Sequence, residues 1–220
     1  MTDLSNRRPL KIRDQQLMRR FAAWLSRRSV TPNQISVLSV VFALGGGAAL
    51  VMAGQTLASE RSLWFLAAAL LIQLRLLCNL FDGMVAMEGG KQTLAGELFN
   101  DVPDRIADPL LIIACGFALP DYPSAMWLAW LGALLAVMTA YIRVLGVSLG
   151  LPADFRGPMA KQQRMALITV AAVISALEIF WGHYGMVLWI SLIVLVVGSA
   201  MTAMRRLIGA YLRLQQRGAN

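Results

Sequence analysis

The sequence predicts an all-α integral membrane protein, with six transmembrane helices preceded by an N-terminal amphipathic helix at the membrane interface. Of its 220 residues, 58% are hydrophobic and only 15% are charged, whereas soluble domains have about 25% charged residues. The mean hydropathy is +0.62. Apolar stretches of membrane-spanning length follow one another through most of the chain. These observations indicate one compact helical bundle with no second soluble domain.

Polar residues and turns divide the apolar sequence into six expected spans. They are Gln34–Ala53, Leu63–Ala86, Leu94–Ala118, Ser124–Leu149, Arg164–Trp181 and Tyr184–Met204. Either Thr31 or Asn33 caps the first of these helices, since both side chains accept hydrogen bonds from free backbone N–H groups. Three consecutive glycines, residues 45 to 47, allow another helix to approach this span closely.

The segment before the first span is basic, and its apolar residues recur at helical spacing. Leu17, Phe21, Trp24 and Leu25 favour a helix that lies in the interface, and the alternative is a solvated basic tail. The N-terminal thirty residues lack an apolar core followed by small residues, so no cleavable signal peptide is expected. The expected organisation is a basic amphipathic segment, a membrane domain and a basic tail, at residues 1–30, 31–210 and 211–220.

Six spans place both termini on the same side of the membrane. The connections on that side carry lysines and arginines, whereas the three connections on the other side carry only Arg61. Because positive residues favour the cytoplasmic side, both termini are expected in the cytoplasm. The formal net charge of +8 then reflects topology and attraction to anionic lipid headgroups. No nucleic-acid partner is expected, because no nucleic-acid motif accompanies the charge.

Half of the twelve acidic residues fall where the end of the second span meets the start of the third. They are Asp82, Glu88, Glu97, Asp101, Asp104 and Asp108. Ionisable groups at membrane depth face a cavity or a partner and are functional candidates. Asn79 and Asp82 share one helical face, as do Asn100 and Asp104, and a Gly-Gly turn brings the two faces together. Clusters of oxygen ligands favour hard cations such as Mg²⁺ or Mn²⁺, which suit a pyrophosphate substrate.

The alternative is that these acids pair internally with Arg75, Lys91 and Arg105. Three cations do not neutralise six acids, so this count predicts a pocket with a net negative charge. A net negative pocket at the cytoplasmic leaflet favours a metal site within reach of a water-soluble nucleotide.

The same stretch resembles the signature of the CDP-alcohol phosphotransferase family, Asp-x2-Asp-Gly-x2-Ala-Arg-x8-Gly-x3-Asp-x3-Asp. Every spacing matches from Asn79 to Asp104. The departures are Asn79 and Asn100, which replace the first and third acids, and Met87, which replaces the arginine. Asparagine keeps a carbonyl oxygen but lowers the ligand charge from four to two. This change is expected to weaken divalent binding and to leave one tight site where family members typically hold two ions. The alternative is that Asp101 or Glu97 compensates, although each lies at a different helical angle from Asn100.

Two further segments extend the resemblance over nearly the whole chain. Residues 32–36 are similar to the family's PNxx[ST] start. Tyr141-x-Arg143 and the segment 161–164 are similar to its basic acceptor-side segment. The resemblance also implies a homodimer in the bacterial inner membrane.

The resemblance implies a role for each matching residue. Asp104 is the expected general base, and its alternative role is a further metal ligand. The expected ligands of the divalent cation, Mg²⁺ or Mn²⁺, are Asn79, Asp82, Asn100 and Asp104. The expected contacts of the donor nucleotide are Asn33, Ser36, Gly83, Ala86 and Gly96. The expected acceptor-binding residues are Arg143, Lys161 and Arg164, for which the alternative is contact with lipid headgroups.

Three hypotheses about function follow. In the first, the protein is an enzyme that moves a phosphatidyl-type group from a CDP-linked lipid to a small polar alcohol and releases CMP. In the second, it is a non-catalytic relative that binds a nucleotide-lipid or a partner protein, as Asn79, Met87 and Asn100 indicate. The third, a proton-coupled transporter, is disfavoured because the acids cluster at one leaflet and no inverted repeat is visible. The identity of the acceptor does not follow from the sequence.

Overall fold

A computed structural model describes residues 16–28, 31–88 and 96–218, and every regular element in these ranges is a helix. The all-α prediction is therefore confirmed. The elements are α1 Gln16–Arg27, α2 Pro32–Gln55, α3 Ala58–Glu88, α4 Gly96–Phe117, α5 Ala125–Ser148, α6 Lys161–Leu177, the 3₁₀ helix η3 Glu178–Trp181 and α7 Met186–Gly218.

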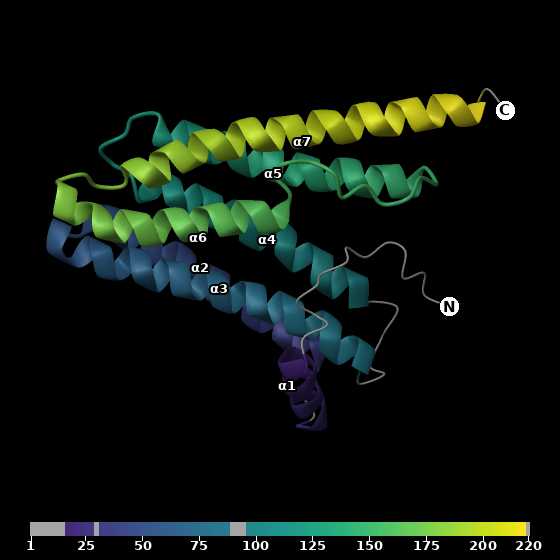
Figure 1. Cartoon of the computed structure of the whole chain (residues 1–220), viewed down its shortest axis with the longest axis horizontal. Helices are drawn as coiled ribbons and strands as arrows, with labels where there is room; N and C mark the ends of the chain where they lie inside the picture. The colour runs from purple at the N-terminus through teal and green to yellow at the C-terminus, as the bar shows by residue number, and fades with distance from the viewer. Residues whose placement is uncertain (1–15, 29–30, 89–95, 219–220) are drawn as a thin grey trace.

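The six long helices of the described ranges form a closed ring. Helix α2 packs on α3 and α4, α4 on α5, α5 on α7, α7 on α6, and α6 returns to α3. Figure 1 shows these helices side by side, with α1 lying across one end. Small and branched apolar residues fill the interior, among them Leu50, Phe65, Ile72, Leu111, Ile112, Leu192 and Leu195. The main core of the ring therefore receives residues from distant parts of the sequence.

The outward faces of the ring are also apolar, as a lipid environment requires. Leu44, Leu70, Leu134 and Val197 are among the large hydrophobic residues that remain exposed. Within the described ranges, five helices are long and apolar enough to cross a membrane, namely α2, most of α3, α5, α6 with η3, and α7. Helix α4 is the sixth long helix, and its N-terminal part, up to Asp108, contains Asp101, Asp104, Arg105 and Asp108. Of the six spans expected from the sequence, five are therefore long and apolar enough to cross a membrane, and α4 differs from them by its charged residues.

Helix α1 packs on the protein as well as presenting an amphipathic face. Ala22 is fully buried, and Met18 and Leu25 pack against a cluster that includes Phe81 and Val85 of α3. Trp24 remains half exposed. The apolar stripe that predicted an interfacial helix is therefore divided between α3 and the surroundings.

Thr31, and not Asn33, caps α2. The backbone N–H of Gln34 donates to Thr31 Oγ1 at 3.2 Å, and the Thr31 N–H donates to Gln34 Oε1 at 3.0 Å. This reciprocal capping box satisfies backbone groups at the start of α2, the helix that carries Ser36.

Helix α7 does not end at Met204, where the sequence placed the end of the last span. It has 33 residues and continues to Gly218. At 1.5 Å per residue it is about 50 Å long, against roughly 30 Å for the hydrocarbon layer. Its C-terminal part therefore extends beyond the membrane, where Arg205 and Arg206 are compatible with an uninterrupted helix.

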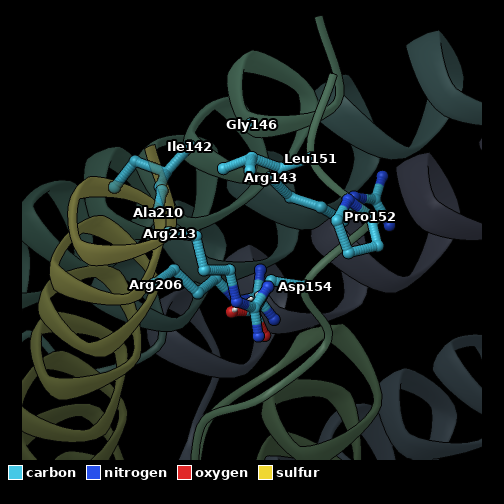
Figure 2. A pocket seen from close by; sticks show the side chains of 9 residues that line it. All are labelled: Ile142, Arg143, Gly146, Leu151, Pro152, Asp154, Arg206, Ala210 and Arg213. Carbon is cyan, nitrogen blue, oxygen red and sulfur yellow. Dashed lines mark ion pairs between the residues drawn. The ribbon is translucent and has the colours of Figure 1, made fainter. Parts of the chain in front are cut away.

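The extended end of α7 holds the connection between α5 and α6 in place. The N–H of Met159 donates to Thr202 Oγ1 at 3.0 Å, and Arg206 Nε donates to the Arg156 carbonyl at 2.9 Å. Between α5, this connection and α7 lies a small basic pocket (Figure 2), lined by Ile142, Arg143, Gly146, Leu151, Pro152, Asp154, Arg206, Ala210 and Arg213.

The opposite end of the ring contains Glu178, a buried acid that the sequence patterns do not explain. Its carboxylate accepts hydrogen bonds from the backbone N–H groups of Gly185, at 2.6 Å, and Val187, at 2.8 Å. Free N–H groups at a helix N-terminus bind anions well. Glu178 thus caps α7 across the η3 turn and has a structural role.

Candidate functional site

Asp82 lies near the C-terminal end of α3 and faces the start of α2. The Ser36 hydroxyl donates to Asp82 Oδ2 at 2.8 Å, and Asp82 is only 3% exposed. Its other oxygen, Oδ1, is buried and has no hydrogen-bond partner among the described residues. A buried carboxylate oxygen without a partner is costly. It is the kind of atom that a bound cation satisfies, so Asp82 fits the role of an anionic metal ligand.

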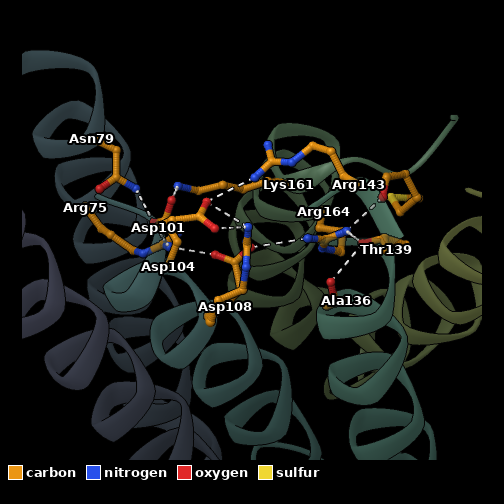
Figure 3. A network of polar contacts seen from close by, with 12 residues as sticks. Arg75, Asn79, Asp101, Asp104, Asp108, Ala136, Thr139, Arg143, Lys161 and Arg164 are labelled. Atoms are coloured by element: carbon orange, nitrogen blue, oxygen red, sulfur yellow. Dashed lines mark hydrogen bonds and ion pairs between the residues drawn. The ribbon is translucent and has the colours of Figure 1, made fainter. Parts of the chain in front are cut away.

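Three further carboxylates form a row along one face of α4. Asp101, Asp104 and Asp108 are spaced by three and four residues, and a basic residue from α5 or α6 faces each of them (Figure 3). Arg143 Nη2 is 3.0 Å from Asp101 Oδ1, Lys161 Nζ contacts Asp104 Oδ2, and Arg164 Nη2 is 3.3 Å from Asp108 Oδ2. The predicted acceptor side and the predicted acidic side therefore meet directly.

Helix α3 supplies a second set of partners to the same row. Arg75 Nη2 is 2.9 Å from Asp104 Oδ1 and 2.6 Å from Asp108 Oδ1. Asn79 Nδ2 donates to Asp104 Oδ1 at 3.0 Å. Figure 3 shows Arg75 and Asn79 reaching this row from α3 and Lys161 reaching it from the other side. Asp104 thus receives contacts from three side chains.

The prediction of a net negative pocket is wrong for the described residues. Their four acids, Asp82, Asp101, Asp104 and Asp108, lie beside five cations, Arg75, Arg105, Arg143, Lys161 and Arg164. The sequence count took cations from the two neighbouring segments only, whereas the ring brings three more from α5 and α6. No three Asp, Glu, His or Cys side chains within these ranges form a metal-binding group.

The three acceptor-side residues differ in accessibility. The side chains of Arg143 and Lys161 are each 26% exposed, whereas that of Arg164 is 3% exposed. Arg164 also donates to the Met159 carbonyl at 2.9 Å and to Thr139 Oγ1 at 3.3 Å. It therefore holds the start of α6 in place, while Arg143 and Lys161 remain accessible.

The remaining predicted donor-side residues lie on the elements around Asp82. Asn33 is in the first turn of α2, Gly83 and Ala86 follow Asp82 on α3, and Gly96 begins α4. Asn100 lies in α4, but its side chain, like those of Met87, Glu88 and Glu97, is outside the described part of the structure. The metal contact predicted for Asn100 thus stays a prediction.

Sequence reasoning did not assign functional roles to Arg75, Asp108 and Arg206. Asp108 had a usable signal, since it follows Asp104 by four residues on the same face. Arg75 was expected among the internal partners of the six acids, and its contacts with Asp104 and Asp108 confirm that expectation for this residue. Arg206 reaches the Thr139 carbonyl at 2.7 Å across 67 residues, and no local pattern predicts this contact.

The fold and the site define a class: helical membrane proteins whose charged residues gather at one end of the bundle beside a motif with family-specific spacing. The family model described as CDP-alcohol phosphatidyltransferase matches residues 29–211. The chain therefore belongs to the CDP-alcohol phosphatidyltransferase family, which confirms the resemblance. The family consists of membrane transferases of phospholipid biosynthesis.

Curated relatives and solved structures agree with this membership. The chain is 25% identical over 191 residues to the inner membrane protein YnbA of Escherichia coli, covering 87% of this chain and 90% of YnbA. It is 30% identical over 202 residues to the phosphatidylinositol phosphate synthase of Streptomyces avermitilis, covering 86% and 75%.

Two crystal structures of the Mycobacterium tuberculosis phosphatidylinositol phosphate synthase PgsA1 share the fold. The structure in complex with manganese and citrate has a TM-score of 0.72 at 19% identity, covering 88% of each chain. The structure with CDP-DAG bound has a TM-score of 0.71 at 18% identity, covering 90% of this chain and 94% of PgsA1. At these identities the likeness concerns the fold alone.

Proposed function

We propose that the protein transfers a phosphatidyl-type group from a CDP-linked lipid to a small polar alcohol and releases CMP, at the bacterial inner membrane. The observation that carries this proposal is that one end of the ring holds both Asp82, whose buried Oδ1 has no partner among the described residues, and an acidic row that meets the accessible cations Arg143 and Lys161. Family membership supports it, as do the relatives named phosphatidylinositol phosphate synthases.

On the donor side, Asp82 with Asn79 and Asn100 as neutral ligands would hold Mg²⁺ or Mn²⁺. When bound, such an ion neutralises phosphate oxygens and steadies the departing CMP. Ser36 donates to Asp82 Oδ2 and so leaves Oδ1 for the ion. The small residues Gly83 and Ala86 would leave space for the nucleotide base. Asn33 and Gly96 belong to the same donor-side proposal.

On the acceptor side, the accessible cations Arg143 and Lys161 favour an anionic alcohol, such as a phosphorylated polyol. The acceptor hydroxyl oxygen would attack the lipid-linked phosphorus, the bond from phosphorus to the CMP oxygen would break, and Asp104 would take the hydroxyl proton. Because Lys161 contacts Asp104 Oδ2, an anionic acceptor that draws Lys161 away would free that oxygen for the proton. Arg164 would position the start of α6 and would not contact the acceptor.

This arrangement needs the charged end of the ring at the cytoplasmic face, where nucleotides are available. Both termini would then be cytoplasmic, as the distribution of basic residues favours. A homodimer is part of the same proposal and rests on the family resemblance.

The test is CMP release from CDP-diacylglycerol by the purified full-length protein with Mn²⁺ and a panel of anionic and neutral alcohols. We expect release by the wild type with at least one anionic acceptor and none by Asp82→Asn. Asp121→Asn is the matched control, since Asp121 is an exposed acid at the other end of the ring. Absence of release with every acceptor, beside an active family member, would contradict the proposal.

The second candidate is a non-catalytic relative that binds a nucleotide-lipid or a partner protein. It is favoured by the contacts that occupy both oxygens of Asp104. The test is whether Asp82→Ala still complements a deletion strain. A non-catalytic relative predicts that complementation is retained, whereas an enzyme predicts that it is lost.

A further inference from the structure

Arg75 is the most deeply buried charged side chain of the candidate site. It lies on α3 one turn before Asn79, and its exposed fraction is 0%. Its Nε and Nη1 groups have no hydrogen-bond partner among the described residues. Burying a guanidinium is costly, and an apolar side chain of similar size is often as good or better for stability. Folding alone therefore does not account for an arginine at this position.

The guanidinium joins two carboxylates of the neighbouring helix. A single nitrogen, Nη2, is 2.9 Å from Asp104 Oδ1 and 2.6 Å from Asp108 Oδ1. The first contact has hydrogen-bond geometry, whereas the second is a charge contact in which Asp108 Oδ1 accepts no well-directed hydrogen bond. Arg75 thus occupies the position between two anions that a bridging cation takes in an acidic cluster.

The other oxygens of the row also have basic partners. Lys161 contacts Asp104 Oδ2, and Arg164 lies 3.3 Å from Asp108 Oδ2. Each of the four carboxylate oxygens of Asp104 and Asp108 therefore lies beside a protein cation. Among the described residues Asp82 differs, because its Oδ1 has no hydrogen-bond partner and its Oδ2 accepts a hydrogen bond from the neutral Ser36 hydroxyl.

Asn79 matches this distribution of charge. Its amide donates to the same Asp104 oxygen that Arg75 contacts, at 3.0 Å. An aspartate at this position would place two like charges in contact, and a metal ion would be needed to hold them together. The neutral amide and the guanidinium together make such an ion unnecessary at Asp104 Oδ1.

We propose that Arg75 is a built-in cation of the site: it compensates Asp104 and Asp108, so that the chain binds one divalent cation, at Asp82. The inference rests on the proposed function, since it assumes a metal at Asp82. Arg75 is in this view a positioning residue that fixes the Asp104 carboxylate and contacts no substrate.

The test counts Mn²⁺ ions bound to the purified full-length protein by electron paramagnetic resonance titration. We expect one Mn²⁺ per wild-type chain, with the six-line spectrum of an isolated ion. In Arg75→Met, two carboxylates lose their shared cation, and the count should rise from one to two, with spin coupling between neighbouring ions. Arg75→Lys retains a cation and should still bind one.

Two Mn²⁺ ions per wild-type chain would overturn the inference, as would none. A folded Arg75→Met protein that still binds one ion would also overturn it, folding being checked by thermal melting in detergent. Should this variant not fold, the wild-type count decides alone. CMP release is measured separately, so an active wild type with two bound ions would refute this inference and leave the proposed function intact.

Discussion

At the scale of single residues, Asp82 and Asp104 show how one motif gives two carboxylates different surroundings. Both are buried, and they are the second and the fourth acid of the family signature. The neutral Ser36 hydroxyl donates to Asp82, whereas Arg75, Asn79 and Lys161 contact Asp104. An oxygen without a partner is available to a cation, and an ion-paired oxygen becomes available only when its partner moves. The two roles proposed for these residues follow from this difference.

Ser36→Ala should weaken Mn²⁺ binding about fivefold. The hydroxyl is the only described hydrogen-bond donor side chain that orients Asp82, and one such bond contributes about 1 kcal/mol. Ser36→Thr should retain the affinity. Ser39→Ala is the matched control, because Ser39 donates to the Ser36 carbonyl on the same helix. Equal Mn²⁺ dissociation constants for the wild type and Ser36→Ala would contradict this expectation.

Lys161→Met should lower kcat/KM for an anionic acceptor by roughly 30- to 150-fold, since a charge-assisted contact contributes about 2–3 kcal/mol. The loss should be smaller with a neutral acceptor. Arg205→Met, at an exposed position of α7, serves as control and should leave both values unchanged. The same loss with neutral and anionic acceptors would show that Lys161 does not select for charge.

At the scale of elements, α2 packs closely on α4 and so helps to close the ring that holds the acidic row. Gly54 makes this approach possible, because a Cβ atom there would lie 2.0 Å from the Phe117 carbonyl oxygen. That neighbour is backbone and moves only with its helix. The glycines of α2 thus act as the sequence predicts, although the tightest position is outside residues 45 to 47.

Gly54→Ala should therefore destabilise the protein by about 1–3 kcal/mol, the usual effect of overpacking. Gly45→Ala is the control, since its Cβ would meet only the flexible Leu71 side chain, at 3.4 Å. Thermal melting of both variants in the same detergent measures the difference. Equal melting temperatures would mean that α2 and α4 separate easily.

The connection before α6 contributes to stability in a way that depends on pH and can therefore be tested. Burial alone would raise the pKa of Asp154, but hydrogen bonds from Arg156 outweigh it and hold this pKa below its ordinary value. A lowered pKa stabilises the fold above the ordinary value of about 4, and this contribution disappears as the pH falls through the folded-state pKa. The stability difference between wild type and Asp154→Asn should thus be present at pH 7 and shrink below about pH 4. A difference that stays constant down to pH 3 would contradict this.

At the scale of the whole molecule, the acidic row and its basic partners gather at one end of the ring, whereas the other end has the Arg61–Asp121 pair and the buried Glu178. The connections after α2, α4 and α6 gather at one end, and the acidic row, the α5–α6 connection and the C-terminal end of α7 lie at the other (Figure 1). A protein with this polarity has one functional face. Its orientation determines whether that face meets the cytoplasm.

Labelling of introduced cysteines tests that orientation. Ser59→Cys and Gln216→Cys place thiols at exposed positions of opposite ends, while the native Cys78 and Cys115 are buried. In intact spheroplasts, a membrane-impermeant maleimide should label Ser59→Cys and should label Gln216→Cys only after permeabilisation. The reverse pattern would place the charged end outside the cell.

The sequence by itself determined the helical membrane fold, the approximate spans and the family, because hydropathy, helical period and motif spacing are local properties. Only the tertiary structure decided which charges meet. Arg75 and Asp104 are 29 residues apart, Arg143 and Asp101 are 42 apart, and Arg164 and Asp108 are 56 apart. These pairs form because α4 packs between α2 and α5 and because α7 holds the start of α6, and neither contact has a sequence period. The sign of the site's charge therefore depends on packing across the ring.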